Sequence, residues 1–130
     1  STGGMFKKRW GRIGDSPVIG AGTYADNNSC AVSCTGHGEY FIRHAVAFDV
    51  CARYKYLKES VEKAADYIIH TELNTNAGNG GLIAVDKLGN IAMPYNSGGM
   101  FRGFLYKEKG SPEIKKGCGI GKKIVVVGEK

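Results

Sequence analysis

The chain has 130 residues, of which 42% are hydrophobic and 23% are charged, and its formal net charge is +6 at pH 7. This length is enough for one domain with a hydrophobic core. No apolar run within these residues approaches the ~20 residues of a membrane-spanning helix, no signal peptide is expected among them, and the twenty glycines show no collagen-like period. The composition therefore predicts a globular protein without a membrane partner.

The first third of the chain is predicted to be irregular backbone followed by two short strands. Residues 1–14 are expected to form a loop or a strand end, and Ser16-Pro17 favours an extended or turn backbone. Residues 23–26 are predicted to form a short strand, and residues 26–29 a turn, because Asp, Asn and Ser side chains bond to nearby backbone. Residues 30–34 are predicted to form a small-residue strand that is buried on both faces.

Two helices are predicted next. The first runs from His37 to Leu57, with Glu39 near its start, where a negative charge suits the helix dipole. Its apolar stripe is predicted to consist of Phe41, Ala45, Phe48 and Ala52. Ser60 is predicted to be the N-cap of the second helix. The buried face of that helix follows the i, i+3, i+4, i+7, i+8 pattern through Val61, Ala64, Ala65, Ile68 and Ile69.

The rest of the chain is predicted to alternate between strands and turns. The predicted strands are residues 82–85, 91–95, 101–106 and 124–127. Residues 73–81 and 96–99 are expected to be loops, and residues 86–90 a hairpin turn with Gly89 or Asn90 at positive φ. Residues 111–121 are rich in Gly and Lys and are expected to be mobile. Two successive helices followed by hairpins predict an α+β fold, with helices on one face of an antiparallel sheet.

The positive charges gather in two places, residues 7–9 and a basic tail from Lys107 to Lys130. No basic strand interleaved with aromatic residues and no recognition helix accompanies them. We therefore expect a solvated surface, and no nucleic acid partner, although a basic nucleic-acid-binding module remains an alternative.

The cysteines at positions 30, 34, 51 and 118 form no C-x-x-C pair. A zinc site would need closer spacing or a Cys/His set, so no metal is expected. Cys30 and Cys34 lie four residues apart in a predicted strand and should face the same way. Buried free thiols are typical of a reducing compartment, and we expect a cytoplasmic protein.

One cation and one anion stand out in the glycine-rich stretch that begins at Gly11. Arg12 and Asp15 lie three residues apart. Arginine binds a carboxylate as a planar fork, and aspartate accepts hydrogen bonds from an ammonium group. The pair would therefore match a ligand that carries both groups, such as an amino acid. The alternative is a glycine-rich connection with a surface ion pair.

A second segment of the same stretch, Thr35-Gly-His-Gly-Glu39, ends an apolar run and precedes a predicted helix. This context suits backbone N–H groups that point outward and hold a negatively charged oxygen. Together with Arg12 and Asp15, it indicates a candidate site for a small anionic or zwitterionic ligand.

Several motifs occur in the order and at the spacing of a known family. They are Ser1-Thr-Gly-Gly4, Gly11-Arg-Ile-Gly-Asp-Ser-Pro17, Gly20–Ala25, Ser33–Glu39, Gly80–Val85 and Met93–Asn96. Over roughly Ser1 to Gly103 the chain resembles the β subunit of the isoaspartyl peptidase/L-asparaginase family of N-terminal nucleophile hydrolases. The related glycosylasparaginases share the Gly-Arg-x-Gly-Asp-Ser-Pro run but usually have Asn where this chain has Gly3.

The resemblance implies roles for individual residues. Thr2 would orient the catalytic threonine, and Thr35 and Gly36 would stabilise the oxyanion with a hydroxyl and a backbone N–H. Arg12 and Asp15 would bind the α-carboxylate and α-amino groups of the substrate. In the same loop as Gly36, Gly38 would permit a close approach of the backbone.

The family mechanism gives histidine no catalytic role, so His37 and His44 are expected to be structural. His70 ends the second predicted helix, where a cation suits the dipole. No cofactor is expected, although some relatives hold an alkali cation with backbone oxygens.

The nucleophile of the family is the threonine freed at the start of the β subunit by self-cleavage, and it precedes the Ser-Thr-Gly-Gly motif. The resemblance therefore implies that the nucleophile lies upstream of Ser1 and that about one hairpin is missing. Ser1 itself, with a free amine and a hydroxyl, is the alternative nucleophile, but it matches the serine of the motif.

The architecture that the resemblance implies is a four-layer αββα sandwich, of which residues 1–130 would supply about half as a partial β-subunit domain. The α subunit of the same precursor would supply the rest, in a dimer of αβ units. The expected function is hydrolysis of L-asparagine and β-aspartyl peptides by the intact enzyme, with the chain alone inactive. The alternatives are a glycosylasparaginase-like amidase and a catalytically inactive truncated paralogue that only associates with other chains.

Overall fold

A computed structural model describes residues 7–107, 114–121 and 125–129. The chain divides into two compact units, Ser1–Asn96 and Ser97–Lys130, and each has its own antiparallel sheet. The first unit contains both its sheet and all the helices between β2 and β3, which confirms the predicted α+β class. Within the described ranges, no helix is long and apolar enough to cross a membrane.

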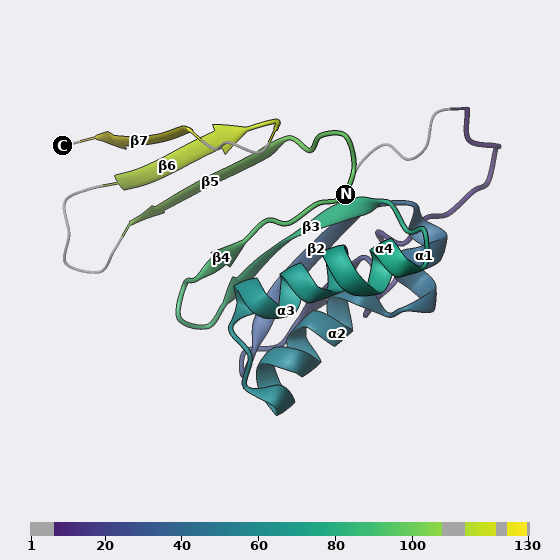
Figure 1. The fold of residues 1–130 in the computed structure, drawn as a ribbon, viewed down its shortest axis with the longest axis horizontal. Helices are drawn as coiled ribbons and strands as arrows, with labels where there is room; N and C mark the ends of the chain where they lie inside the picture. Colours follow the sequence, from purple (N-terminus) through teal and green to yellow (C-terminus); the bar gives the residue numbers. More distant parts are fainter. Residues whose placement is uncertain (1–6, 108–113, 122–124, 130) are drawn as a thin grey trace. The chain divides into compact units, whose positions relative to one another are not determined.

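The sheet of the first unit has four strands in the order β1-β2-β3-β4. They are β1 (Thr23–Ala25), β2 (Cys30–Gly36), β3 (Gly80–Asp86) and β4 (Ile91–Ala92). Strands β2, β3 and β4 are labelled in Figure 1. Neighbouring strands are antiparallel, and the long β2–β3 pair aligns Cys30 with Asp86 and Gly36 with Gly80. The strand predicted at residues 91–95 is shorter than expected, since beyond Ala92 only Tyr95 forms an isolated bridge, to Gly81.

The two predicted turns of this sheet are confirmed. Between β1 and β2, the Ser29 N–H donates to the Asp26 carbonyl at 2.8 Å. Between β3 and β4, Gly89 has φ 89°, which a residue without a Cβ adopts easily. Asp86 Oδ1 accepts from the N–H groups of Leu88 and Asn90 at 2.8 and 2.9 Å, so one carboxylate closes the hairpin.

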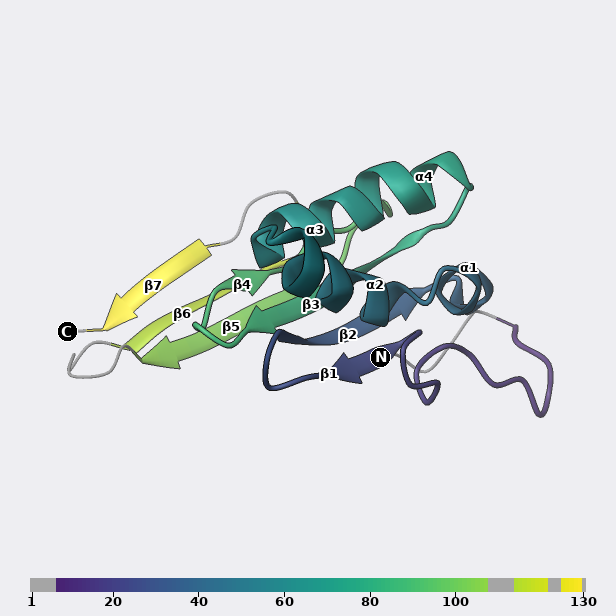
Figure 2. The ribbon, with the colours of Figure 1, turned by 90° about the horizontal axis from the view of Figure 1, so that it is seen from below.

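Strand β2 is buried on one face only. The side chains of Cys30, Val32 and Cys34 are at most 4% exposed, whereas Ala31 between them is exposed. The prediction of burial on both faces is wrong, because the helices cover a single face of the sheet, as Figure 2 shows for α2 and α3. The prediction that Cys30 and Cys34 face the same way is confirmed.

The first predicted helix is not continuous. It is divided into α1 (Gly38–Arg43), α2 (Val46–Ala52) and the π-helical η1 (Arg53–Leu57), with Ala45 in the left-handed region at φ 44°. The break changes the phase of the buried face. Phe48 is 44% exposed and Ala45 is exposed, and the residues of α2 that enter the core are Val46, Ala47, Val50 and Cys51.

The glycine-rich loop explains how the helix restarts after Ala45. The N–H of Ala47 donates to the Ala21 carbonyl at 3.0 Å, and the N–H of Phe48 donates to the Gly20 carbonyl at 2.8 Å. N–H groups in the first turn of a helix have no partner within it, so carbonyls from another segment stabilise a start at this position. The loop before β1 thereby caps α2.

The second predicted helix is confirmed. It comprises α3 (Val61–Tyr67), the π-helical η2 (Ile68–Glu72) and α4 (Leu73–Thr75), so the helical backbone extends into residues expected to be a loop. Ser60 is the N-cap, with Oγ accepting from the Lys63 N–H at 3.3 Å. All five residues predicted for its buried face, Val61, Ala64, Ala65, Ile68 and Ile69, are 0% exposed.

The second unit is a three-stranded antiparallel sheet in the order β5-β6-β7. It contains β5 (Arg102–Lys107), β6 (Ile114–Gly119) and β7 (Val125–Glu129). The strands predicted near residues 101–106 and 124–127 are confirmed within a residue or two, except that Ile124 lies outside the described residues. Ile114–Gly119, expected to be mobile, forms a strand instead. Cys118 is exposed, unlike the other three cysteines, and all four thiols are free.

Candidate active site

The glycine-rich loop folds back on itself beside the end of β2. The Asp15 carbonyl accepts hydrogen bonds from the N–H groups of Val18 and Gly22, at 2.9 and 3.1 Å. A Cβ at Gly22 would overlap the backbone of Asp15, and its distance to the Ser16 Cα would be only 2.7 Å. Only glycine at position 22 allows this approach, which brings Asp15 close to the sheet.

Asp15 is buried, with 4% of its surface exposed, and it packs against the first residue of α1. A Cβ on Gly38 would lie 2.8 Å from the Asp15 nitrogen and 2.9 Å from Oδ1, so glycine is required at this position too. Asp15 Oδ2 makes no hydrogen bond within the described residues. Removal from water raises the pKa of the Asp15 carboxyl above its ordinary value. A buried carboxylate oxygen that accepts no hydrogen bond from the described residues can receive a cationic ligand.

Arg12 forms an ion pair with Glu39, and not with Asp15. The distance from Arg12 Nη2 to Glu39 Oε1 is 2.6 Å, with the two side chains 21% and 59% exposed. The Glu39 backbone N–H and the Arg12 guanidinium both lower the pKa of Glu39. The interpretation of Arg12 and Asp15 as a surface ion pair is therefore wrong. Sequence reasoning gave Glu39 only a role at the helix start.

Thr35 and Gly36 lie at the end of β2, next to this loop. The His37 N–H donates to the Asn79 carbonyl at 2.8 Å, on the β3 side of the strand. N–H groups of successive strand residues point to opposite edges, so the Gly36 N–H points to the β1 side, as does the Cys34 N–H, which donates to Gly22. That is the side on which the Asp15 loop lies.

The structure thus brings five of the six predicted site residues to one end of β2. Arg12 and Asp15 come from the loop, Gly36 from the strand and Gly38 from α1, and Thr35 lies beside Gly36 in β2. Thr2 and the alternative nucleophile Ser1 lie outside the described residues. Together, these groups offer a carboxylate, a guanidinium, a hydroxyl and a backbone N–H to a small ligand.

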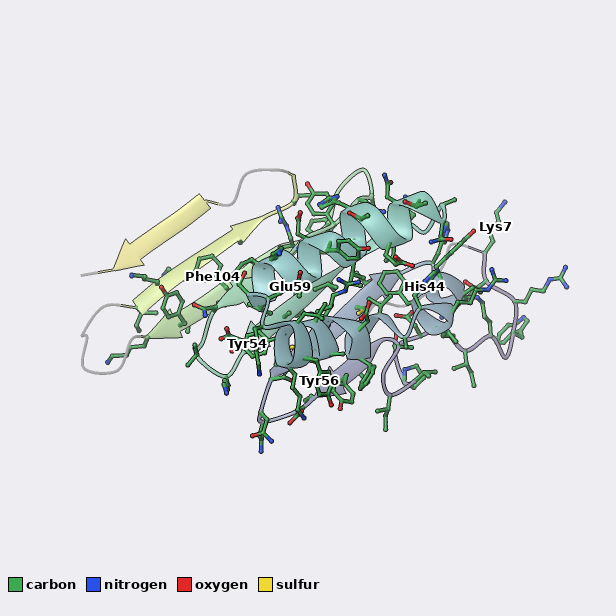
Figure 3. All side chains as sticks on the ribbon, turned by 60° about the horizontal axis from the view of Figure 1, so that its bottom comes forward. Lys7, His44, Tyr54, Tyr56, Glu59 and Phe104 are labelled. Carbon is green, nitrogen blue, oxygen red and sulfur yellow. The ribbon has the colours of Figure 1, made fainter. Side chains whose placement is uncertain are left out.

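The histidines contact neighbouring side chains. The centroids of the His37 and Tyr40 rings lie 6.2 Å apart. His44 Nδ1 lies 3.3 Å from Glu72 Oε1, where the segment after α1 approaches the second helix (Figure 3). His70 Nε2 lies 3.4 Å from Asp66 Oδ1, one helical turn earlier. In the part of the chain that the structure describes, no group of three or more His, Cys, Asp or Glu side chains could hold a metal ion.

Comparison with known proteins gives a consistent result. A family model described as Asparaginase matches residues 1–114. The isoaspartyl peptidase of Salmonella typhimurium is 52% identical over 106 residues, which cover 82% of this chain and 34% of the relative. The isoaspartyl peptidase of Escherichia coli is 47% identical over 120 residues, covering 85% of this chain and 37% of that protein.

A plant protein is similar to the same degree. The probable isoaspartyl peptidase/L-asparaginase 2 of Arabidopsis thaliana is 52% identical over 103 residues, covering 79% of this chain and 31% of its own length. The chain therefore spans about a third of the length of these relatives. The breadth of the family match and the level of identity lead to one conclusion: the chain belongs to the asparaginase family that includes the isoaspartyl peptidases.

Proposed function

We propose that the protein containing this chain hydrolyses L-asparagine and β-aspartyl peptides. The observation that carries this proposal is the buried Asp15 carboxylate, whose Oδ2 makes no hydrogen bond within the described residues, at the same end of β2 as Arg12 and Gly36. Such a site presents an anion to an α-ammonium group and a cation to an α-carboxylate. The names isoaspartyl peptidase and L-asparaginase, carried by the relatives above, support the same activity here.

Asp15 would bind the substrate ammonium. Among the described residues no group donates a hydrogen bond to Asp15 Oδ2, and a substrate ammonium beside this buried oxygen would donate one. Gly38 would take part by leaving room for Asp15 at the start of α1.

Arg12 would bind the substrate α-carboxylate. Its contact with Glu39 is made through Nη2, and a guanidinium carries five N–H donors, so one group can serve both carboxylates. Glu39 is 59% exposed, so this pair lies where a ligand from solvent can approach it.

The chemical step would follow the family mechanism. A threonine outside these 130 residues, with its own amine as the base, would attack the side-chain carbonyl carbon of the substrate, and Thr2 would orient it. The Thr35 hydroxyl and the Gly36 N–H would stabilise the oxyanion. Collapse of the tetrahedral intermediate would release ammonia or the peptide amine, which takes up a proton. Water would then hydrolyse the acyl-enzyme and release the aspartyl product. The reaction needs no cofactor.

The outer face of the sheet supports a proposal about partners. Ile83 and Val85, two residues apart in β3, are 47% and 46% exposed and lie on the same face. We propose that a second sheet, to which the α subunit of the precursor contributes, covers this face in a four-layer αββα sandwich, and that two αβ units form a dimer. The free thiols of Cys30, Cys34 and Cys51 support a reducing compartment such as the cytoplasm.

The test is an activity assay of the complete precursor after maturation. Release of ammonia from L-asparagine, and of the free amino acid from a β-aspartyl dipeptide, should both be observed. A protein that matures but cleaves neither substrate would contradict the proposal and favour an inactive paralogue. Cleavage of glycosylated asparagine alone would favour the glycosylasparaginase-like alternative.

A further inference from the structure

Asn96 forms hydrogen bonds with both backbone polar groups of Gly80, the first residue of β3. Its side-chain Oδ1 accepts from the Gly80 N–H at 2.8 Å, and its own backbone N–H donates to the Gly80 carbonyl at 2.9 Å. In the sequence, Asn96 is only the last residue of a motif and the start of a predicted loop. The structure makes it the partner of both polar backbone groups of Gly80.

The same amide ties two further segments to this point. Asn96 Nδ2 donates to the Gly78 carbonyl at 2.8 Å and to the Ile69 carbonyl in η2 at 3.2 Å. Two carbonyls and one N–H match the two donors and the acceptor of a carboxamide, so the orientation of the amide is defined by its partners. Neither a carboxylate nor a hydroxyl can satisfy all three groups.

Gly80 is in turn packed directly against Gly36. A Cβ on Gly36 would lie 2.6 Å from the Gly80 Cα, and a Cβ on Gly80 would lie 2.8 Å from the Gly36 Cα. The Phe41 ring closes the same space, at 2.9 and 2.8 Å from these two Cβ positions. With backbone against backbone and no intervening side chain, a displacement of Gly80 must displace Gly36.

We propose that Asn96 is a positioning residue for the oxyanion site, acting through Gly80 on the N–H of Gly36. The inference rests on the proposed function, since it requires Gly36 to donate to the oxyanion. The amide fixes the end of β3, and the end of β3 fixes the direction of the Gly36 N–H. A donor that acts in the transition state affects kcat more than KM.

The decisive experiment compares Asn96→Ala with Asn90→Ala in the complete matured enzyme. Asn90 is a matched control because its side-chain Nδ2 also makes a short hydrogen bond, 2.8 Å to Asp86 Oδ2, but in the turn at the opposite end of β3. Asn96→Ala should lower kcat for L-asparagine on the order of tenfold to a hundredfold, with KM changed less than about threefold. Asn90→Ala should lower the melting temperature without lowering kcat.

Asn96→Asp refines the comparison, because it keeps the shape and the acceptor for the Gly80 N–H but loses both donors. Asn96→Asp should lower kcat with KM nearly unchanged. If Asn96→Ala does not fold, Asn96→Asp is compared with Asn90→Ala in its place. Assays are run well below the melting temperature of each variant, so that loss of folded protein does not lower kcat.

Two results would overturn the inference. The first is a kcat for the folded Asn96 variants equal to that of Asn90→Ala. The second is a loss that appears in KM alone, which would place the effect on substrate binding. An inactive wild-type enzyme would instead overturn the proposed function, and this inference with it, so the two failures are distinguishable.

Discussion

The guanidinium of Arg12 donates to the carboxylate of Glu39 across 2.6 Å, although 27 residues separate them in the chain. The contact joins the glycine-rich loop to the start of α1. It leaves Asp15, three residues from Arg12, buried with an Oδ2 that makes no hydrogen bond within the described residues. The two residues that appear paired in the sequence therefore do not form an ion pair with each other, and under the proposed function each would bind one charged group of the substrate.

Arg12→Ala should raise KM strongly while the protein stays folded. Loss of a charge-assisted contact with the substrate carboxylate costs roughly 1.5–3 kcal/mol, or about tenfold to a hundredfold in KM. The measurement is steady-state kinetics of the matured enzyme on L-asparagine. Arg43→Ala, at the exposed last residue of α1, is the matched control and should change little. Unchanged kinetics in Arg12→Ala would contradict the assignment.

Asp15→Asn should weaken binding of substrates that carry a free α-ammonium group. The amide has the shape of the carboxylate but lacks its charge, so only the interaction with the ammonium is lost. The assay compares L-asparagine with its α-N-acetylated analogue in wild type and variant. Asp66→Asn, on an exposed position of α3, serves as the control. Equal losses on both substrates would mean that Asp15 supports the loop and does not bind the ammonium.

The same substitution should stabilise the ligand-free enzyme at neutral pH. Burial raises the folded-state pKa of Asp15 above 3.8, so the folded state holds its proton more tightly than the unfolded state. The wild type therefore loses stability as the pH rises from about 3.8 to the raised pKa, and Asp15→Asn does not. Each unit by which burial raises the pKa of Asp15 lowers the unfolding free energy of the wild type at neutral pH by about 1.4 kcal/mol.

Urea unfolding of both proteins between about pH 3 and pH 7 measures this difference. The unfolding free energy of Asp15→Asn minus that of the wild type should increase as the pH rises and then become constant. A gain of the same size at both ends of the range would show that packing of the amide, and not ionisation of Asp15, is responsible.

Gly36→Ala should destabilise the fold by about 3 kcal/mol or more, because its Cβ would lie 2.6 Å from the Gly80 Cα and would also overlap the Asn79 carbonyl. Gly89→Ala is the control. Gly89 has positive φ but no atom within 4 Å of the added Cβ, so it should cost only roughly 1–2 kcal/mol. Thermal unfolding of the two variants checks the order, and a reversed order would contradict the close packing of Gly36 on Gly80.

Local features of the fold could be read from the order of residues. The helix after Ser60 follows from the spacing of its apolar residues and its N-cap, and Gly89 marks the hairpin turn. These features depend on interactions within about four residues, which spacing and residue type encode directly. Arg12 and Asp15 can be proposed as ligand-binding residues in the same way, because they carry the charges that an amino acid ligand requires.

The partners of those residues depend on how distant segments meet. The helix is broken at Ala45 and restarts where the carbonyls of Gly20 and Ala21 accept hydrogen bonds from the N–H groups of the first turn of α2. Arg12 meets Glu39 across 27 residues, and Asn96 meets Gly80 across 16. Hydrogen bonds of this range have no period in the sequence, because they form only after the sheet and its helices bring separate segments together.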